Sequence, residues 1–336
     1  MGHKIDTSMI NIRTDLAIEE EINNKNIIKE EFENIIVSTI NIDEDIRCYK
    51  KKGKYITIEY SDVTDHENFI KVEEVFIKEL TKLLNGYNIK NDDSCLVIGL
   101  GNENSTPDCL GPLSINNIIV TNHFYNLKIN VDSGFRCVSA INPGVMGQTG
   151  IETFDIIKAV VDKIKPDFVI VVDSLKASSV DRVNKTIQIT DAGINPGSGI
   201  GNNRKEINKE LLNVPVFAIG IPTVVDTITI VDDSINYMAK YYSYFKNNIN
   251  NVKEKLKISR TNFKNYDVSI ENKKELFGIF GGLSNEESKS FISEVLIPIG
   301  YNMIVTSKDI DFQIKKLSQL IGNGINNVLH LNVTHL

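Results

Sequence analysis

Two unbroken apolar runs, each closed by Gly or Asp, constrain the fold of this chain most strongly. The first is Leu96–Ile98 followed by Gly99, and the second is Phe168–Val172 followed by Asp173. Runs of this kind, without alternation, fit strands buried on both faces of a parallel sheet. Strand and helix patterns alternate from residue 95 to residue 244. The sequence therefore predicts an α/β fold, a mostly parallel sheet with helices on both faces.

The carboxyl ends of these two strands carry the clearest candidates for chemistry. Asp108 follows the first strand after a short loop, and Asp173 closes the second directly. In open α/β sheets, ligands bind in the crevice beyond the carboxyl ends of the strands. Each acid alone could simply favour a helix N-terminus, but both fall at one edge of the sheet. We therefore predict a shared site that hydrolyses its substrate with a carboxylate pair.

Two Gly-rich loops, residues 142–150 and 191–201, are predicted to border this crevice. Glycine in a fixed conformation costs folding entropy, so two such loops beside one crevice favour a functional role. Their backbone would suit an extended peptide. The residues assigned to substrate binding are Asn102, Gly144, Gln148, Ser174, Asp191 and Ser198.

Composition excludes several classes of function. The net charge of -7 lacks the basic footprint that nucleic-acid binding requires. No apolar stretch reaches the length of a bilayer span, so we expect no membrane contact. The four Cys form no CxxC pair and the five His show no ligand spacing, which argues against a disulfide framework and a zinc site. We expect no metal and no cofactor, and a reducing compartment.

The rest of the chain divides around this core. We predict a leader-like segment at residues 1–15, a catalytic domain at 16–245, and a C-terminal extension at 246–336 that packs on the main domain. Within the catalytic domain, Ile and Phe at helical spacing predict an acidic helix from Leu16 toward Val37. In the extension, a capping box at Ser284 predicts one helix, and a second is expected from Ser307.

Several long segments resemble the germination proteases of spore-forming bacteria, the endopeptidases that degrade small acid-soluble spore proteins during germination. The matching segments are Ile12–Ala17, Gly99–Pro112, Ser139–Ile141, Pro143–Thr153, Arg182–Asn184, Thr186–Ile189, Pro196–Gly199 and Pro222–Asp226. The resemblance implies a fold similar to that of hydrogenase-maturation endopeptidases. In that related family two acids bind metal, and they match Asp108 and Asp173. In germination proteases the pair is thought to act as an aspartic-type dyad without metal.

The resemblance also implies a homotetramer, made as a zymogen in the cytoplasm of the forespore, the later spore core. The zymogen would remove its own leader, and Thr14–Ala17 matches the junction, so the cut would fall between Asp15 and Leu16. The chain departs from the family at Asn195, where a His is expected, and at Glu103, where an aromatic residue is expected. These departures concern the rim of the crevice and therefore substrate preference.

Two alternatives stay open on the sequence. The first is a metal-assisted peptidase that uses the same two acids, because carboxylate oxygens also suit a hard divalent ion. The second is a non-catalytic protein that binds spore proteins without cutting them.

Overall fold

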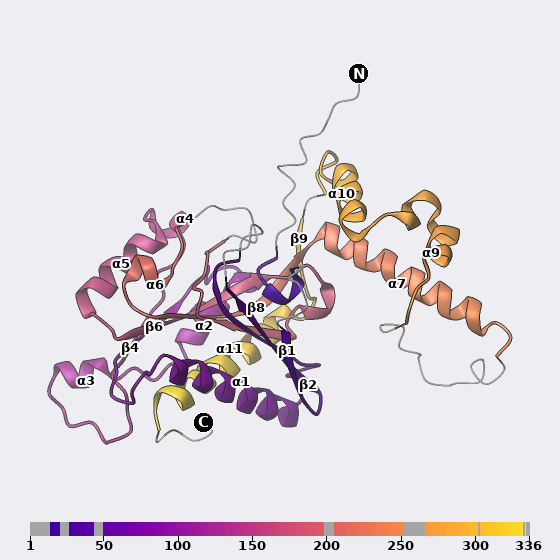
Figure 1. Cartoon of the computed structure of the whole chain (residues 1–336). Coiled ribbons are helices and arrows are strands. Elements are labelled where there is room, and N and C mark those ends of the chain that lie inside the picture. Colours follow the sequence, from indigo (N-terminus) through magenta and orange to yellow (C-terminus); the bar gives the residue numbers. More distant parts are fainter. Residues whose placement is uncertain are drawn as a thin grey trace. The chain divides into compact units, whose positions relative to one another are not determined.

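The computed structural model describes residues 14–20, 27–43, 50–197, 205–251, 266–301, 303–331 and 333 (Figure 1). The chain divides into two compact units. The sheet unit comprises Arg13–Ala177, Asp181–Val224 and Thr306–Leu336, and the helical unit comprises Met1–Ile12, Ser178–Val180 and Val225–Val305.

One sheet organises the sheet unit, with strands in the order β1-β2-β3-β7-β8-β6-β4-β5. The strands are β1 (Ile27–Phe32), β2 (Ile35–Ile42), β3 (Gly53–Glu59), β4 (Cys95–Gly99), β5 (Val138–Ile141), β6 (Phe168–Lys176), β7 (Thr186–Thr190) and β8 (Val216–Asp226). The strands β8, β6, β4 and β5 are mutually parallel, whereas β1, β2, β3 and β7 form antiparallel pairs. A ninth strand, β9 (Ile304–Thr306), pairs with β8. The predicted α/β fold is confirmed, but the mutually parallel part comprises only four of the nine strands.

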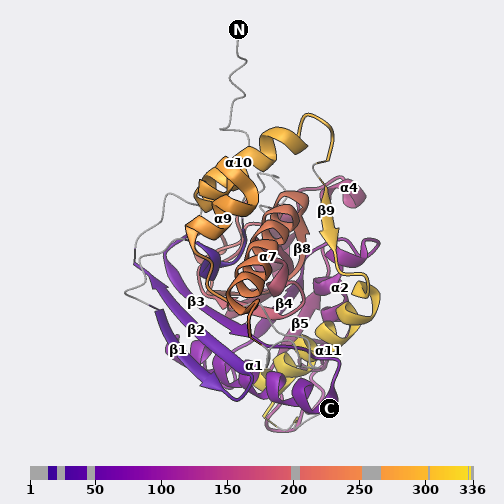
Figure 2. The same cartoon turned by 90° about the vertical axis from the view of Figure 1, so that its right-hand side faces the viewer.

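The antiparallel half begins with a hairpin where the sequence predicted a helix. In residues 16–20 and 27–37, the described part of this range, the only helix is the short 3-10 helix η2 (Ala17–Glu19), and β1 pairs with β2 from Ile27↔Ile40 to Phe32↔Ile35 (Figure 2). The predicted helix is therefore wrong. Five of the first six residues of β2 are β-branched (Ile35, Ile36, Val37, Thr39 and Ile40), and β-branched residues favour a strand over a helix.

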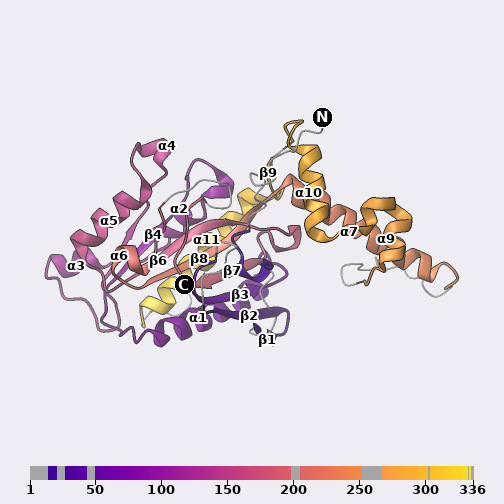
Figure 3. The same ribbon diagram turned by 45° about the horizontal axis from the view of Figure 1, so that its top comes forward.

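Helices cover both faces of the sheet (Figure 3). On one face, α1 (His66–Gly86), α2 (Leu110–Ile115) and α11 (Ile310–Leu329) share one core with the sheet, which includes Phe76, Leu110, Leu320 and Val172. On the other face, α5 (Thr153–Ile164) and α6 (Lys209–Leu212) pack on Val169 and Val171. The shorter elements are η4 (Thr106–Asp108), α3 (Asn122–Asn126), α4 (Met146–Thr149) and η5 (Val180–Arg182).

The helical unit contains α7 (Thr227–Asn248), α9 (Ile270–Phe277), η7 (Gly278–Gly282) and α10 (Asn285–Leu296). The helix predicted from the capping box is confirmed, since Ser284 and Glu287 exchange side-chain-to-backbone hydrogen bonds at the start of α10. A buried bond from Ser288 Oγ to Asp232 Oδ1 (2.8 Å) joins α10 to α7. Over the described ranges, no helix combines the length and the apolar character that crossing a bilayer requires.

The C-terminal end of α11 is anchored in the sheet unit by a buried histidine. His330 is fully buried, and its Nδ1 accepts a hydrogen bond from the Arg136 backbone N–H (3.2 Å). The other ring nitrogen, Nε2, lies 3.1 Å from the Ile119 carbonyl oxygen, so it is the protonated nitrogen. The neutral ring therefore satisfies both partners, whereas the imidazolium would place a second N–H against the Arg136 N–H.

We expect this anchor to make the protein less stable in mild acid. Burial lowers the pKa of His330 below its usual value, so the folded state disfavours the protonated ring. The stabilisation is therefore present above the unfolded-state pKa of about 6.5 and is lost as the pH falls through and below that value. Urea unfolding at about pH 8 and about pH 5.5 should show this loss, and it should be smaller in His330→Gln. Equal losses in both proteins would contradict the assignment.

Candidate active site

The loop after β4 folds back onto Asp108. The backbone N–H of Asn102 donates both to Asp108 O (3.1 Å) and to Asp108 Oδ2 (2.9 Å). Gly101 makes this return possible, because its φ is +117° and a Cβ there would lie 1.9 Å from Asp108 O. Only glycine tolerates such a conformation and such an approach. The loop therefore fixes the half-buried carboxylate of Asp108 relative to the end of β4.

Three neighbouring strands hold this loop at the carboxyl edge of the sheet. The backbone N–H of Leu100 donates to Val172 O on β6 (2.8 Å), and Thr223 Oγ1 on β8 donates to Pro107 O (2.6 Å). At the start of α2, Gly111 lies so close that a Cβ would be 2.2 Å from Leu100 O and 2.6 Å from Val172 O. Asp108 is thus held by contacts to β4, β6 and β8.

Asp173 comes directly after Val172, the residue to which the Asp108 loop is bonded. It is 6% exposed and pairs with Gly220 of β8, and its Oδ1 accepts the backbone N–H of Ser174 (2.8 Å). Because Val172 packs in the core on the α1 face, the side chain of Asp173 points to the α5 face. The structure thus places Asp108 and Asp173 at one edge of the sheet, the edge that the sequence predicted.

Three of the predicted substrate-binding residues lie together beside Asp108. Gln148 Nε2 donates to Asn102 Oδ1 (2.7 Å), and Gln148 Oε1 lies 3.3 Å from the position of a Cβ at Gly144. The carbonyl of Gly144 accepts from Thr153 Oγ1 (3.2 Å), which ties the loop to α5. A chain of contacts therefore leads from Asp108 through Asn102 to the loop at residues 142–150.

The remaining predicted binding residues differ in position. Ser174 follows Asp173, and its Oγ is buried with no hydrogen-bond partner among the residues that the structure describes. Asp191 follows β7, which runs antiparallel to β8, so it lies at the opposite edge of the sheet. There it accepts from Lys54 N (2.7 Å) and Tyr87 Oη (3.0 Å). Ser198 lies outside the described residues.

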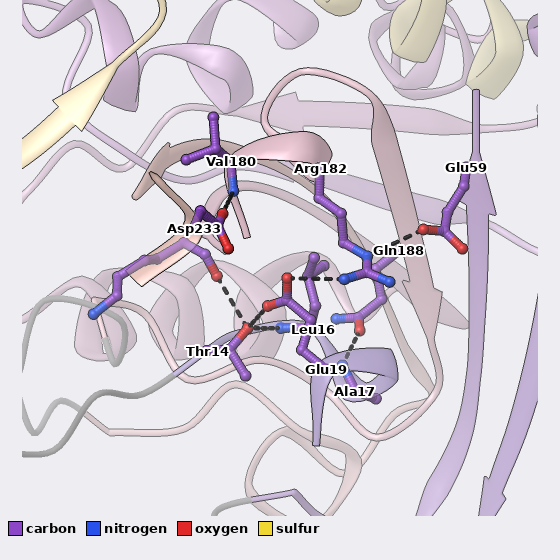
Figure 4. A network of polar contacts seen from close by, with 10 residues as sticks. Thr14, Leu16, Ala17, Glu19, Glu59, Val180, Arg182, Gln188 and Asp233 are labelled. Carbon is purple, nitrogen blue, oxygen red and sulfur yellow. Dashed lines mark hydrogen bonds and ion pairs between the residues drawn. The ribbon is translucent and has the colours of Figure 1, made fainter. Parts of the chain in front are cut away.

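The predicted leader junction is packed against the sheet. Leu16 and Ala17 are fully buried, and the backbone N–H of Asp15 donates to Lys176 O (3.0 Å). In return, Lys176 N–H donates to Asp15 Oδ2 (2.9 Å). The amide of Gln188 spans the junction, because its Nε2 donates to Asp15 O (3.0 Å). Its Oε1 accepts from Ala17 N–H (2.7 Å) (Figure 4).

Charged residues secure both sides of this segment. Arg182 contacts Glu19 through Nη1 (3.3 Å) and Glu59 through Nε (3.1 Å), and Glu19 is 2% exposed at its side chain (Figure 4). On the other side, Lys50 Nζ donates to Thr14 O (3.2 Å). Burial lowers the pKa of Lys50, partly offset by the acids near it. Sequence reasoning assigned no role to Lys50, Arg182 or Gln188, although Arg182 and Gln188 lie in segments that match the family. A local signal was Gln188 itself, which stands between Ile187 and Ile189 in a fully buried strand.

Metal ligands and the thiol beside Asp108 also bear on the chemistry of the site. In the described part of the chain, no group of three or more His, Cys, Asp or Glu is arranged to hold a metal ion. Cys109, the neighbour of Asp108, donates its thiol to Thr106 O (3.1 Å). Burial raises the pKa of Cys109, which disfavours the thiolate that nucleophilic chemistry needs.

Similarity to known proteins identifies the family. A family model described as germination protease matches residues 6–335. The chain is 42% identical to the germination protease of Bacillus licheniformis over 356 residues, covering 98% of this chain and 96% of the relative. It is 42% identical to that of a Geobacillus species with the same coverage, and 41% identical to that of Bacillus thuringiensis.

Among solved structures, a NiFe hydrogenase maturation protease from Thermococcus kodakarensis is similar at 18% identity with a TM-score of 0.26. That match covers 43% of this chain and 80% of the other. The similarity to germination proteases over nearly the full chain is sufficient to assign the family. This chain belongs to the germination protease family and is an endopeptidase of spore germination.

Proposed function

We propose that this endopeptidase starts the degradation of small acid-soluble spore proteins, and that Asp108 and Asp173 together activate the hydrolytic water. The observation that carries the proposal is the bond from Leu100 N–H to Val172 O. It attaches the Asp108 loop to the residue directly before Asp173. Two carboxylates at one edge of a parallel sheet are the arrangement that a shared acid-base pair requires.

The chemistry follows from the electrostatics of such a pair. Two close carboxylates do not readily both ionise, so they share one proton. The ionised member takes a proton from water as the water attacks the peptide carbonyl. The protonated member donates a hydrogen bond to the developing oxyanion or gives its proton to the leaving amine. Asn102 and Gln148, which are hydrogen-bonded to each other, would orient an extended substrate along the loop that contains Gly144.

We also propose that the chain is made as a zymogen and releases its leader by a cut between Asp15 and Leu16. The support is the sequence of the junction, together with its attachment to Lys176, three residues beyond Asp173 on β6. With the family resemblance, we further propose a homotetramer, located in the cytoplasm of the forespore and later in the spore core. No metal ion is part of this proposal.

Incubation of the purified protein with a small acid-soluble spore protein tests the proposed activity. We expect a few discrete fragments, visible by gel and by mass spectrometry, and equal rates with and without a chelator. A spore protein that binds but stays intact would favour the non-catalytic alternative. Activity that a chelator abolishes and a divalent ion restores would favour metal-assisted hydrolysis and contradict the dyad.

A further inference from the structure

Both polar groups of the Asp15–Leu16 peptide bond are already bonded inside the protein. The carbonyl of Asp15 accepts from Gln188 Nε2 (3.0 Å), and the N–H of Leu16 donates to Thr14 Oγ1 (3.1 Å). Leu16 and Ala17 have no exposed surface. Hydrolysis needs water at the carbonyl carbon and a proton donor at the leaving nitrogen. In this arrangement neither the hydrolytic water nor a proton donor can reach the Asp15–Leu16 peptide bond.

The side-chain amide of Gln188 binds the junction with the hydrogen-bond pattern of a neighbouring β-strand. Its amide pairs with the C=O before Leu16 and the N–H after it, which is how a residue bonds to a neighbouring parallel strand. The side chain is 6% exposed, and each end of the amide has a partner. Lys176 fixes Asp15 from the end of β6 with two further bonds. The junction is thus bound from two strands at once.

The residue that binds the junction, Gln188, is two strands away from Asp173. Gln188, Gly220 and Asp173 form one row across β7, β8 and β6, with their side-chain positions on the same face. Neighbouring strands are roughly 4.8 Å apart, so the Cα atoms of Gln188 and Asp173 are separated by roughly 10 Å. The surface between them is filled, because a Cβ at Gly220 would lie 2.5 Å from Leu175 Cδ1. Leu175 is itself 5% exposed and apolar.

We propose that Gln188 is a positioning residue that locks the leader junction in an uncut state, with Leu175 as the apolar barrier between junction and acid. This inference rests on the proposed cut between Asp15 and Leu16, and it adds how that cut is held back. In this arrangement the Asp15–Leu16 peptide bond is hydrogen-bonded to Gln188 and Thr14, and the side chain of Leu175 lies between Gln188 and Asp173. The junction must leave Gln188 before it is cut, whether by its own acids or by another molecule.

The test uses the full-length protein carrying Asp173→Asn, so that its own acids do not process it. An added endoprotease specific for acidic residues then reports how often the junction opens. In this background, Gln188→Glu keeps the oxygen that accepts from Ala17 N–H but loses the donor to Asp15 O. We expect the cut after Asp15 to become about tenfold faster, since losing one buried hydrogen bond raises the open population by that order. Mass spectrometry identifies the product that begins at Leu16.

Gln319→Glu is the matched control, because Gln319 is an exposed residue on α11. It should leave the rate after Asp15 within about twofold of the parent. Cuts at other acidic residues serve as an internal reference for global unfolding. Equal rates after Asp15 in Gln188→Glu and the parent would overturn the lock.

Hydrogen exchange of the parent protein gives a second test that needs no change at Gln188. The amides of Leu16 and Ala17 should be protected as strongly as those of neighbouring strands, because both are bonded and buried. Exchange at the rate of an unfolded peptide would overturn the lock even if Gln188→Glu failed to fold. Self-processing of the Asp173→Asn parent would instead contradict the proposed dyad, so the two proposals fail by different results.

Discussion

Replacement of Asp173 by Asn is expected to reduce cleavage of a spore-protein substrate by about 10³-fold or more without unfolding the protein. The amide has nearly the volume of the carboxyl group and keeps an oxygen for the N–H of Ser174, which Asp173 Oδ1 now accepts (2.8 Å). It does not accept a proton from water at neutral pH. Asp108→Asn should give a loss of the same order, because the pair acts as a unit.

The measurement is kcat/KM with a purified spore protein, together with urea unfolding of each variant. Asp191→Asn is the matched control, since Asp191 is also an acid at the end of a strand but lies at the opposite edge of the sheet. It should retain most of the activity. Full activity in either Asp108→Asn or Asp173→Asn would reject the dyad, and a large loss in Asp191→Asn would show that the sheet edge is the wrong criterion.

The strands that carry the two acids were predictable because their signal is local. Leu96–Ile98 and Phe168–Val172 are apolar without interruption, and each run ends at a glycine or a polar residue, although buried residues continue beyond both ends. The direction of β7 was missed, and with it the position of Asp191. A local signal existed, since residues 177–185 contain only the short helix η5. A connection that short does not provide the helical crossover that a parallel strand requires.

The contacts at the leader junction could not be predicted, because they join residues far apart in sequence. Gln188 and Ala17 are 171 positions apart. The pairing depends on β7 lying next to β8 and on the N-terminal segment reaching across to it. In the sequence alone, neither Gln188 nor Leu16 stands out. The apolar residues between Leu16 and Val37 were compatible with helical spacing. Only the register of the assembled sheet shows that the Gln188 side chain binds the backbone of Asp15 and Ala17.

Gly111→Ala is expected to damage both stability and catalysis, because this position sets the distance between the Asp108 loop and β6. An added Cβ would lie 2.2 Å from Leu100 O and 2.6 Å from Val172 O, both of them backbone atoms. Contacts this short force α2 and the preceding loop away from the sheet. Overpacking of this kind costs about 3 kcal/mol of unfolding free energy. A displacement of Asp108 by about 1 Å would lower kcat by about 10²-fold.

The two effects can be separated by comparing variants at one urea concentration well below their midpoints. Gly86→Ala is the matched control, because Gly86 lies in α1 with no atom within 4 Å of its Cβ position. The same substitution there should leave kcat unchanged and raise the free energy of unfolding slightly, as alanine favours helix over glycine. If Gly111→Ala kept parental stability and parental kcat, the close approach of α2 would not be what places Asp108. If it lost stability alone, the loop would hold Asp108 through Asn102 and Thr223 without help from Gly111.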